Sequence, residues 1–192
     1  FFFLHPVADT EHLDWISRTR ILMGIAYCLQ HLHNLNPPVP PLPDFTSRSI
    51  FLTNDYAAKI GDIYFWEEFI RKRKKEADAD AEANVYSFGL LLLEIISGRD
   101  PSSEDLIAWG GEYLNDEKRY SCLVDSSLES FKGNELDVIC EVIGNCIQED
   151  PGKRLSMDEI VRILYKEIGI SPERATPGVS PLWWAELEIL SA

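Results

Sequence analysis

The histidines, cysteines and glycines are the first residues to examine for chemistry, since they supply metal ligands, nucleophiles and phosphate-binding loops. The four histidines, His5, His12, His31 and His33, do not stand at metal-ligand spacings from cysteines or carboxylates. The four cysteines, Cys28, Cys122, Cys140 and Cys146, form no C-x-x-C pair. We interpret them as buried, reduced thiols rather than disulfides or metal ligands. The eleven glycines include no G-x-G-x-x-G phosphate loop. These residue types therefore predict neither a metal centre nor a complete nucleotide site.

Three short segments could instead bind a partner. Pro37 to Pro43 contains five prolines and could form a polyproline II ligand, although a rewritten loop inside the fold is the better interpretation. The basic run Arg71 to Lys75 could be a nuclear-import signal or a phospholipid contact, but a solvated surface loop is favoured. The pair Trp183-Trp184 could anchor a partner or dock back on the domain, and both alternatives stay open.

The composition limits the class of protein. A net charge of −14, from 18 Lys and Arg against 32 Asp and Glu, argues against a general nucleic-acid binder and against adsorption to anionic lipid. The length of 192 residues allows one moderate domain or one lobe of a larger one. The most apolar stretch, Val85 to Ile96, is too short to span a bilayer. Phe1 to Leu4 lacks the basic flank of a signal peptide, so we expect the chain to begin inside a folded element.

The elements that must position any site are mainly helical. Apolar residues recur at helical spacing over 13–33, with Asp14 as a start signal. Two short β-like runs at 49–52 and 58–60 flank the turn residues Asn54-Asp55 and predict a small hairpin. Opposite blocks of charge over 71–83 predict a solvated loop or a frayed helix.

The second half of the chain predicts further helices. Residues 85–97 are apolar nearly all round, which is typical of a helix at the centre of a domain, and Gly98 ends it. Amphipathic patterns predict helices over about 103–114, over about 135–148, and from Ser156, where Glu159 completes a capping-box spacing. The expected fold class is therefore mainly α with a small β-hairpin.

Several motifs occur in a recognisable order. They are Val85-Tyr86-Ser87-Phe88-Gly89, then Ser97-Gly98-Arg99-Asp100-Pro101, then Cys146, Asp150-Pro151, Arg154 and Ser156-Met157. Together they resemble the C-terminal lobe of protein kinases, in particular plant receptor-like kinases. The tail Ser180 to Ile189 and the front segment His5 to Trp15 are similar to a small group of plant leucine-rich-repeat receptor-like kinases. That group includes the male-discoverer and root-hair-morphogenesis receptors, many of them classed as inactive.

The resemblance implies a degenerate catalytic loop. The family's H-R-D triplet falls on Leu42-Pro43-Asp44, so Asp44 occupies the position that orients the substrate hydroxyl. Thr46 stands where the family has a lysine, and Ser49 stands where it has a metal-binding asparagine. An ordinary loop aspartate is therefore the better interpretation of Asp44.

The resemblance also implies a degenerate metal-binding segment. The D-F-G triplet falls on Asp62-Ile63-Tyr64, where Asp62 keeps a carboxylate that could bind Mg²⁺ but Tyr64 replaces the flexible glycine. Asn84 replaces the aspartate that hydrogen-bonds the catalytic loop. Asn84 can still accept that hydrogen bond, but without charge assistance.

The segment that would hold a peptide substrate is missing. Only 22 positions separate Asp62 from Asn84, and they include no A-P-E triplet. Arg154, which with Asn84 and Gly89 is a structural position of the family, therefore loses its usual glutamate partner. We expect it to pair with the acidic stretch Glu76 to Glu82 or to face water.

These assignments predict a partial kinase domain over 1–170, with the N-lobe absent, and a C-terminal tail over 171–192. We expect a pseudokinase lobe without enzyme activity or cofactor, acting as a protein-binding or scaffolding module in receptor signalling. We expect a cytoplasmic chain with protein partners, no nucleic acid and no membrane span, from a parent family at the plasma membrane. An isolated lobe would also expose apolar surface that normally meets the N-lobe. The alternative is a fragment of a Ser/Thr or Tyr protein kinase, which would use ATP and Mg²⁺.

Overall fold

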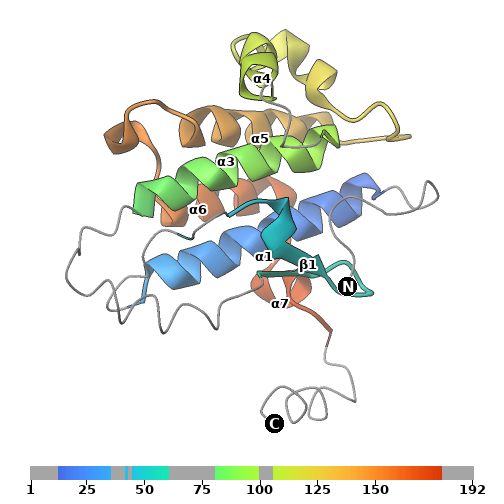
Figure 1. Cartoon of the computed structure of the whole chain (residues 1–192). Coiled ribbons are helices and arrows are strands. Elements are labelled where there is room, and N and C mark those ends of the chain that lie inside the picture. Colours follow the sequence, from blue (N-terminus) through green and yellow to red (C-terminus); the bar gives the residue numbers. More distant parts are fainter. Residues whose placement is uncertain (1–12, 36–41, 43–44, 61–80, 100–105, 179–192) are drawn as a thin grey trace.

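The computed structural model describes residues 13–35, 42, 45–60, 81–99 and 106–178. Its elements, in chain order, are α1 (Trp15–His33), the 3-10 helix η1 (Ser47–Ser49), β1 (Ile50–Leu52), β2 (Ala58–Ile60), α3 (Ala81–Ser97), α4 (Leu106–Leu114), the 3-10 helix η2 (Glu117–Leu123), α5 (Gly133–Cys146), the 3-10 helix η3 (Pro151–Lys153), α6 (Met157–Ile168) and α7 (Pro172–Ala175). Figure 1 shows α1, α3, α5 and α6 stacked against one another, with α4 and η2 at one end and the hairpin and α7 against α1.

The first long helix confirms the prediction made from its apolar spacing. The Asp14 side chain caps α1 by accepting the backbone N–H of Ser17 at 2.8 Å. The face turned toward the rest of the lobe is fully buried and includes Ile21, Leu22, Met23, Ile25 and Leu29. Burying five such side chains contributes on the order of 10 kcal/mol to folding before entropy is subtracted, so α1 forms one side of the core.

The most apolar helix confirms its predicted central place. Its buried apolar residues are Val85, Phe88, Leu91, Leu92, Leu93, Ile95 and Ile96. The predicted start at 85 was one turn too late, because α3 already begins at Ala81. Gly98 ends the helix as expected, and its φ of +65° is a conformation that favours glycine.

The predicted hairpin is present and antiparallel. Ile50 pairs with Ile60 and Leu52 with Ala58. The side chains of Ile50 and Leu52 both join the core. Because successive side chains of β1 point to opposite faces, burying both Ile50 and Leu52 fixes the orientation of the strand and of the segment that precedes it.

The last two long helices also match their patterns. The Ser156 hydroxyl and the Glu159 carboxylate form the predicted capping box at the start of α6. For α5 the observed bounds lie two residues earlier than predicted, since the helix begins at Gly133 and ends at Cys146. The predicted start of the helix near 103 lies outside the described residues.

Two tertiary contacts had no sequence signal. Arg18 is buried in α1, where its Nη1 donates to the Ile95 carbonyl at 2.8 Å and its Nη2 pairs with the Asp125 carboxylate at 2.5 Å. The short helix α7, within the predicted tail, packs on α1 through Ala175, whose carbonyl lies 3.3 Å from where a Cβ on Gly24 would stand. The boundary at residue 170 between lobe and tail stays a prediction.

Candidate functional site

The start of α3 places Asn84 against the segment that leads into the hairpin. Asn84 is only 2% exposed, and its Oδ1 accepts the backbone N–H of Leu42 at 2.7 Å. Leu42 is itself buried in the core. The amide therefore fixes the remnant of the catalytic loop to the central helix, and it satisfies a backbone donor that burial would otherwise leave unpaired.

The other half of the Asn84 amide faces the last turn of α1. Its Nδ2 lies 3.3 Å from His33 Nε2. Since Oδ1 is used as the acceptor for Leu42, Nδ2 must donate, and His33 Nε2 must accept with its ring neutral. Burial lowers the pKa of His33 and the nearby Asp158 carboxylate opposes this shift, so the neutral ring is the favoured form.

The degenerate positions Thr46 and Ser49 lie in one tight turn. Thr46 immediately precedes η1, and its carbonyl accepts the backbone N–H of Ser49 at 2.9 Å. The turn is anchored by Phe45 and Ser47, both buried. Thr46 and Ser49 present hydroxyls at positions where the resemblance predicts an ammonium and an amide, so these two side chains bring no formal charge to a phosphate or to a metal ion. The exposed Arg48 between them is the charged side chain of this turn.

The resemblance assigns the two acidic positions of a kinase site to aspartates. Asp44 and Asp62 lie outside the described residues, as do Pro43 and Tyr64. Their roles stay predictions. Within the part of the chain that the structure describes, no three His, Cys, Asp or Glu side chains gather as a metal ion would require.

Gly89 and Arg154, the other family positions, hold α3 against its neighbours. A Cβ on Gly89 would lie 2.5 Å from the Cβ of Cys146, so α3 and α5 meet where glycine alone fits. Arg154 donates through Nε to the Gln148 carbonyl and through Nη1 to the Glu82 carbonyl, both at 2.9 Å. The expected contact with the acidic stretch is thus present at its last residue, but it uses the backbone carbonyl.

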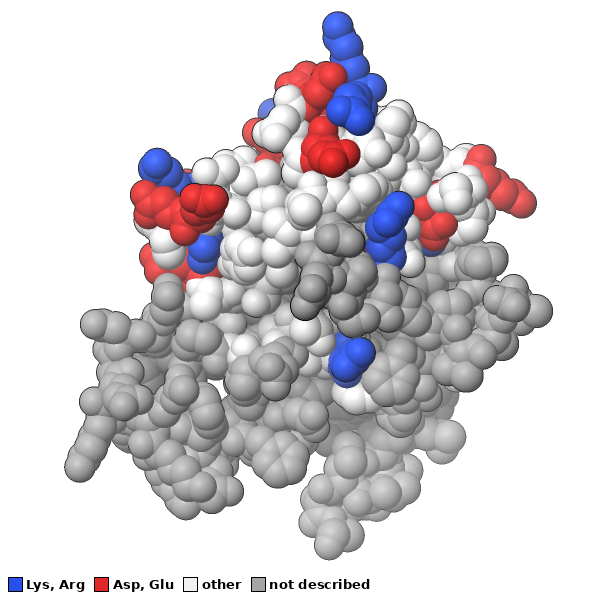
Figure 2. Space-filling view, turned by 45° about the horizontal axis from the view of Figure 1, so that its top comes forward, with Lys and Arg blue, Asp and Glu red and all other residues white. Residues whose placement is uncertain are grey.

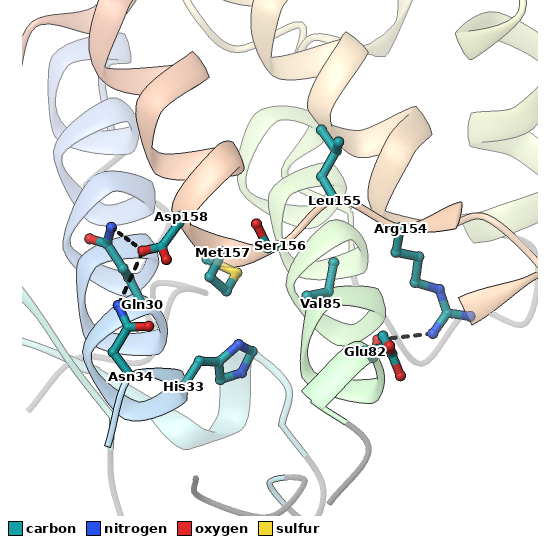
Figure 3. A pocket seen from close by; sticks show the side chains of 10 residues that line it. All are labelled: Gln30, His33, Asn34, Glu82, Val85, Arg154, Leu155, Ser156, Met157 and Asp158. Atoms are coloured by element: carbon teal, nitrogen blue, oxygen red, sulfur yellow. Dashed lines mark hydrogen bonds between the residues drawn. The ribbon is translucent and has the colours of Figure 1, made fainter. Parts of the chain in front are cut away.

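A pocket of about 300 Å³ opens beside these residues (Figure 3). It is lined by Gln30, His33, Asn34, Glu82, Val85, Arg154, Leu155, Ser156, Met157 and Asp158. The side-chain amides of Gln30 and Asn34 donate to Asp158 at 2.8 and 3.1 Å, and these hydrogen bonds lower the pKa of Asp158. The pocket wall nearest α1 is therefore a fixed polar network, and Val85 and Met157 supply buried apolar side chains.

All four cysteines are free thiols, but they differ in exposure. Cys140 and Cys146 are buried, and burial raises the pKa of each to about 12, so neither is a thiolate nucleophile at neutral pH. Cys28 is half-buried. The prediction of burial was wrong for Cys122, which lies exposed in η2, away from the helical apolar patterns that place the other three.

The fold defines the class of the protein as the C-terminal lobe of a protein kinase-like domain. It matches a solved structure of the pseudokinase DRIK1 (drought responsive inactive kinase 1), crystallised with ENMD-2076, with a TM-score of 0.72 and 37% identity. The match covers 88% of this chain and 59% of that one. A second pseudokinase, solved in its apo form, gives a TM-score of 0.71 with 36% identity.

Sequence comparison places the chain among plant receptor-like kinases. It is 46% identical to Protein MALE DISCOVERER 2 of Arabidopsis thaliana over 96% of this chain and 29% of that protein, and 44% identical to Protein MALE DISCOVERER 1 over 96% and 28%. It is 41% identical to an inactive receptor-like serine/threonine-protein kinase of the same plant over 95% and 39%. No family model matches. The chain spans less than a third of the length of the two Male Discoverer proteins.

These relatives confirm the predicted resemblance to plant receptor-like kinases and support the prediction of a pseudokinase lobe. They include inactive receptor-like kinases, and the two solved structures compared above are pseudokinases. No helix within the described ranges is long and apolar enough to cross a membrane.

Proposed function

We propose that this chain is a binding or scaffolding module of plant receptor signalling that has lost phosphoryl transfer. The observation that carries the proposal is the hydrogen bond from the Leu42 N–H to Asn84 Oδ1 at 2.7 Å. It keeps the catalytic-loop remnant attached to α3, but it does so with a neutral amide. A lobe that keeps its fold but lacks the charged groups of a kinase site is suited to binding a partner and unsuited to phosphoryl transfer.

The chemistry supports the loss of activity. Phosphoryl transfer relies almost entirely on positioned charge, from metal ions and cationic side chains around the transferred group. In the described turn, Thr46 and Ser49 stand where the resemblance predicts a lysine and a metal-binding asparagine. Neither hydroxyl neutralises phosphate charge, so these two positions do not supply the electrostatic contribution that a lysine and a metal ligand make in a kinase.

The partner class follows from the family. Receptor-like kinases act through contacts with other proteins, and we propose that this lobe binds a receptor or a kinase of a receptor complex. We further propose that it does so on the cytoplasmic side of the plasma membrane. The preserved core of α1, α3, α5 and α6 supports this role, since it gives a rigid surface on which contacts can be fixed.

The proposal is tested by fusing the full chain to a biotin-transferring label in plant cells and identifying the labelled proteins. Receptor-like kinases should be enriched severalfold over a fusion of the label to an unrelated soluble protein. In parallel, the purified chain is incubated with ATP, Mg²⁺ and an acceptor protein, and no phosphate transfer is expected. Transfer that disappears in Asp62→Ala would overturn the loss of activity, and the absence of receptor or kinase enrichment would overturn the binding role.

A further inference from the structure

Helix α4 is apolar but contributes little to the core. Eight of its nine residues are uncharged, yet its buried residues are only Leu106 and Gly110. Gly110 packs closely on α3, since a Cβ there would lie 2.6 Å from Leu93 Cδ2. Trp109, Tyr113 and Leu114 pack partly against the core. The outward side of the helix is open, since Ile107 is 45% exposed and a Cβ on Gly111 would meet nothing within 4 Å. An open apolar surface of this kind can receive a partner.

One flank of α4 carries two stacked arginines. The Arg99 guanidinium carbon lies 3.9 Å from the ring centroid of Trp109. The Arg119 guanidinium carbon lies 4.5 Å from the ring centroid of Tyr113. The two rings are one helical turn apart, with centroids separated by 5.5 Å. These four residues are here called the arginine–aromatic surface. Arg99 follows the end of α3, Trp109 and Tyr113 lie on α4, and Arg119 lies in η2.

Stacking prepares both arginines to bind an anion. A guanidinium held over a ring keeps its N–H donors at its edges, where they can meet a carboxylate through two parallel hydrogen bonds. Arg119 is fixed further, because its Nη1 donates to the Glu112 carbonyl at 3.2 Å. Both side chains are exposed. The two arginine side chains therefore lose conformational entropy on folding rather than on binding, which favours affinity for a partner.

We propose that the arginine–aromatic surface docks an acidic helix of a partner protein, with two carboxylates one turn apart facing Arg99 and Arg119. Side chains at i and i+4 of a helix stand about 5–6 Å apart on one face, so a helix can present two carboxylates to two neighbouring guanidiniums. Ile107 and Gly111 leave the outward side of α4 open to the apolar side chains of that helix. The inference rests on the proposed binding role and assigns it a surface and a partner chemistry.

The overall charge of the chain does not prevent this contact. Charges farther away than about 8 Å are largely screened at physiological salt, so the net charge of −14 acts weakly beside two contacting guanidiniums. Figure 2, which brings the α4 end of the molecule forward, shows acidic and basic side chains interspersed around a broad uncharged area. The exposed Glu112 carboxylate, on the same helix as the two rings, is an opposing charge and provides a test of its own.

The test uses the full chain and three labelled helical peptides with identical apolar residues and with two Glu, two Gln or two Lys at i and i+4. Fluorescence anisotropy at physiological salt should show the Glu peptide binding about tenfold more tightly than the Gln peptide, and the Lys peptide binding most weakly. In the double variant Arg99→Gln/Arg119→Gln, the Glu and Gln peptides should bind equally. In Glu112→Gln, the Glu peptide should bind about twofold to threefold more tightly.

Lys118→Gln is the matched control, because it removes the same charge from the residue next to Arg119 and leaves the stacks intact. It should keep the preference for the Glu peptide within about twofold. Circular dichroism and the melting temperature establish that each variant is folded. Equal binding of the Glu and Gln peptides, or a preference that survives in the double variant, overturns the proposal.

Sedimentation separates a partner from a second copy of the chain. A dimer that the double variant dissociates would overturn the proposal by showing that another copy occupies the surface. If receptor-like kinases are still enriched in cells by the double variant, the scaffolding role stands and the arginine–aromatic surface is not where it resides.

Discussion

Asn84 is a buried polar side chain at the junction of three segments of the lobe. The amide accepts from Leu42 and faces His33, so a single side chain joins α1, α3 and the catalytic-loop remnant. Asn84→Ala should lower the free energy of unfolding by about 1–3 kcal/mol, because the buried Leu42 N–H loses its acceptor. Urea denaturation measures this. Asn145→Ala, which removes an exposed amide in α5, serves as the control and should change stability by less than about 0.5 kcal/mol.

His33 makes the same junction sensitive to pH. Its pKa in the folded chain is lowered below its ordinary value of 6.5, so the unfolded chain takes up the proton first as the pH falls. The stability that depends on neutral His33 is complete above about pH 6.5 and is lost as the pH falls toward the folded pKa. Melting temperatures between pH 7.5 and 5.5 should therefore decline, and His33→Gln should flatten that decline.

A charge can be introduced at this position, where the resemblance predicts an aspartate. Asn84→Asp places a carboxylate beside His33 Nε2, and the opposite charge should raise the pKa of His33 and reverse the sign of its effect on stability. NMR titration of the ring protons measures the change. The resonance of His31, on the same last turn, is the internal reference. An unchanged pKa for His33 would contradict the assigned hydrogen bond.

At the scale of the elements, the closest helix contact is made by Gly89. Gly89→Ala should destabilise the lobe by about 1–3 kcal/mol, because the new methyl group would lie 2.5 Å from Cys146 Cβ and force α3 from α5. Gly144→Ala is the matched control in α5, where a Cβ meets nothing within 4 Å. It should raise stability by about 0.5–1 kcal/mol through helix propensity. Thermal unfolding of the two variants should therefore shift in opposite directions.

A second contact between elements ties the C-terminal segment to the hairpin. Arg20 on α1 donates to the Asp55 carboxylate at 2.9 Å and to the carbonyls of Arg174 and Thr176, and Asp55 also accepts the Gly178 N–H at 3.1 Å. Hydrogen bonds from Thr53 and Arg20 hold the pKa of Asp55 well below its usual range. Asp55→Ala should therefore speed trypsin cleavage after Arg174 severalfold at neutral pH, since the segment opens locally. Asp150→Ala, a surface aspartate near η3, should leave that rate unchanged.

The sequence predicted those elements whose apolar residues repeat with one period. The helices α1, α5 and α6 follow the 3.6-residue pattern, and the capping box of Ser156 and Glu159 indicated the start of α6. The hydrogen bonds of Arg20 to Asp55 and to the C-terminal segment, and the packing of α7 on α1, had no such pattern, because they depend on which loops meet in space. The site was partly predictable for the same reason. The resemblance indicated Asn84, but the His33 contact required two helices to be placed together.

At the scale of the whole molecule, a kinase-like lobe of this kind is stabilised by its own core rather than by a nucleotide. The buried residues of α1, α3, α5 and α6 form one cluster, which Phe45 and Ile50 on either side of the turn at Thr46 and Ser49 also join. The hydroxyls of Thr46 and Ser49 bring no charge that would hold Mg²⁺ or phosphate. The fold is therefore expected to persist when its catalytic function is lost, which is what allows such a lobe to be kept for binding.

This view predicts that ATP with Mg²⁺ leaves the melting temperature unchanged. A ligand at 100 times its Kd stabilises the folded state by about 2.7 kcal/mol, which for a chain of this size is a rise of roughly 5–10 °C. The measurement is differential scanning fluorimetry of the full chain with up to about 5 mM nucleotide, which would largely saturate a site with a Kd below about 1 mM. The melting temperature should then shift by less than about 1 °C. An active protein kinase domain in the same buffer is the positive control. A dose-dependent rise that disappears in Asp62→Ala would show that the metal-binding position still works, and the lobe would then be a nucleotide sensor rather than a scaffold alone.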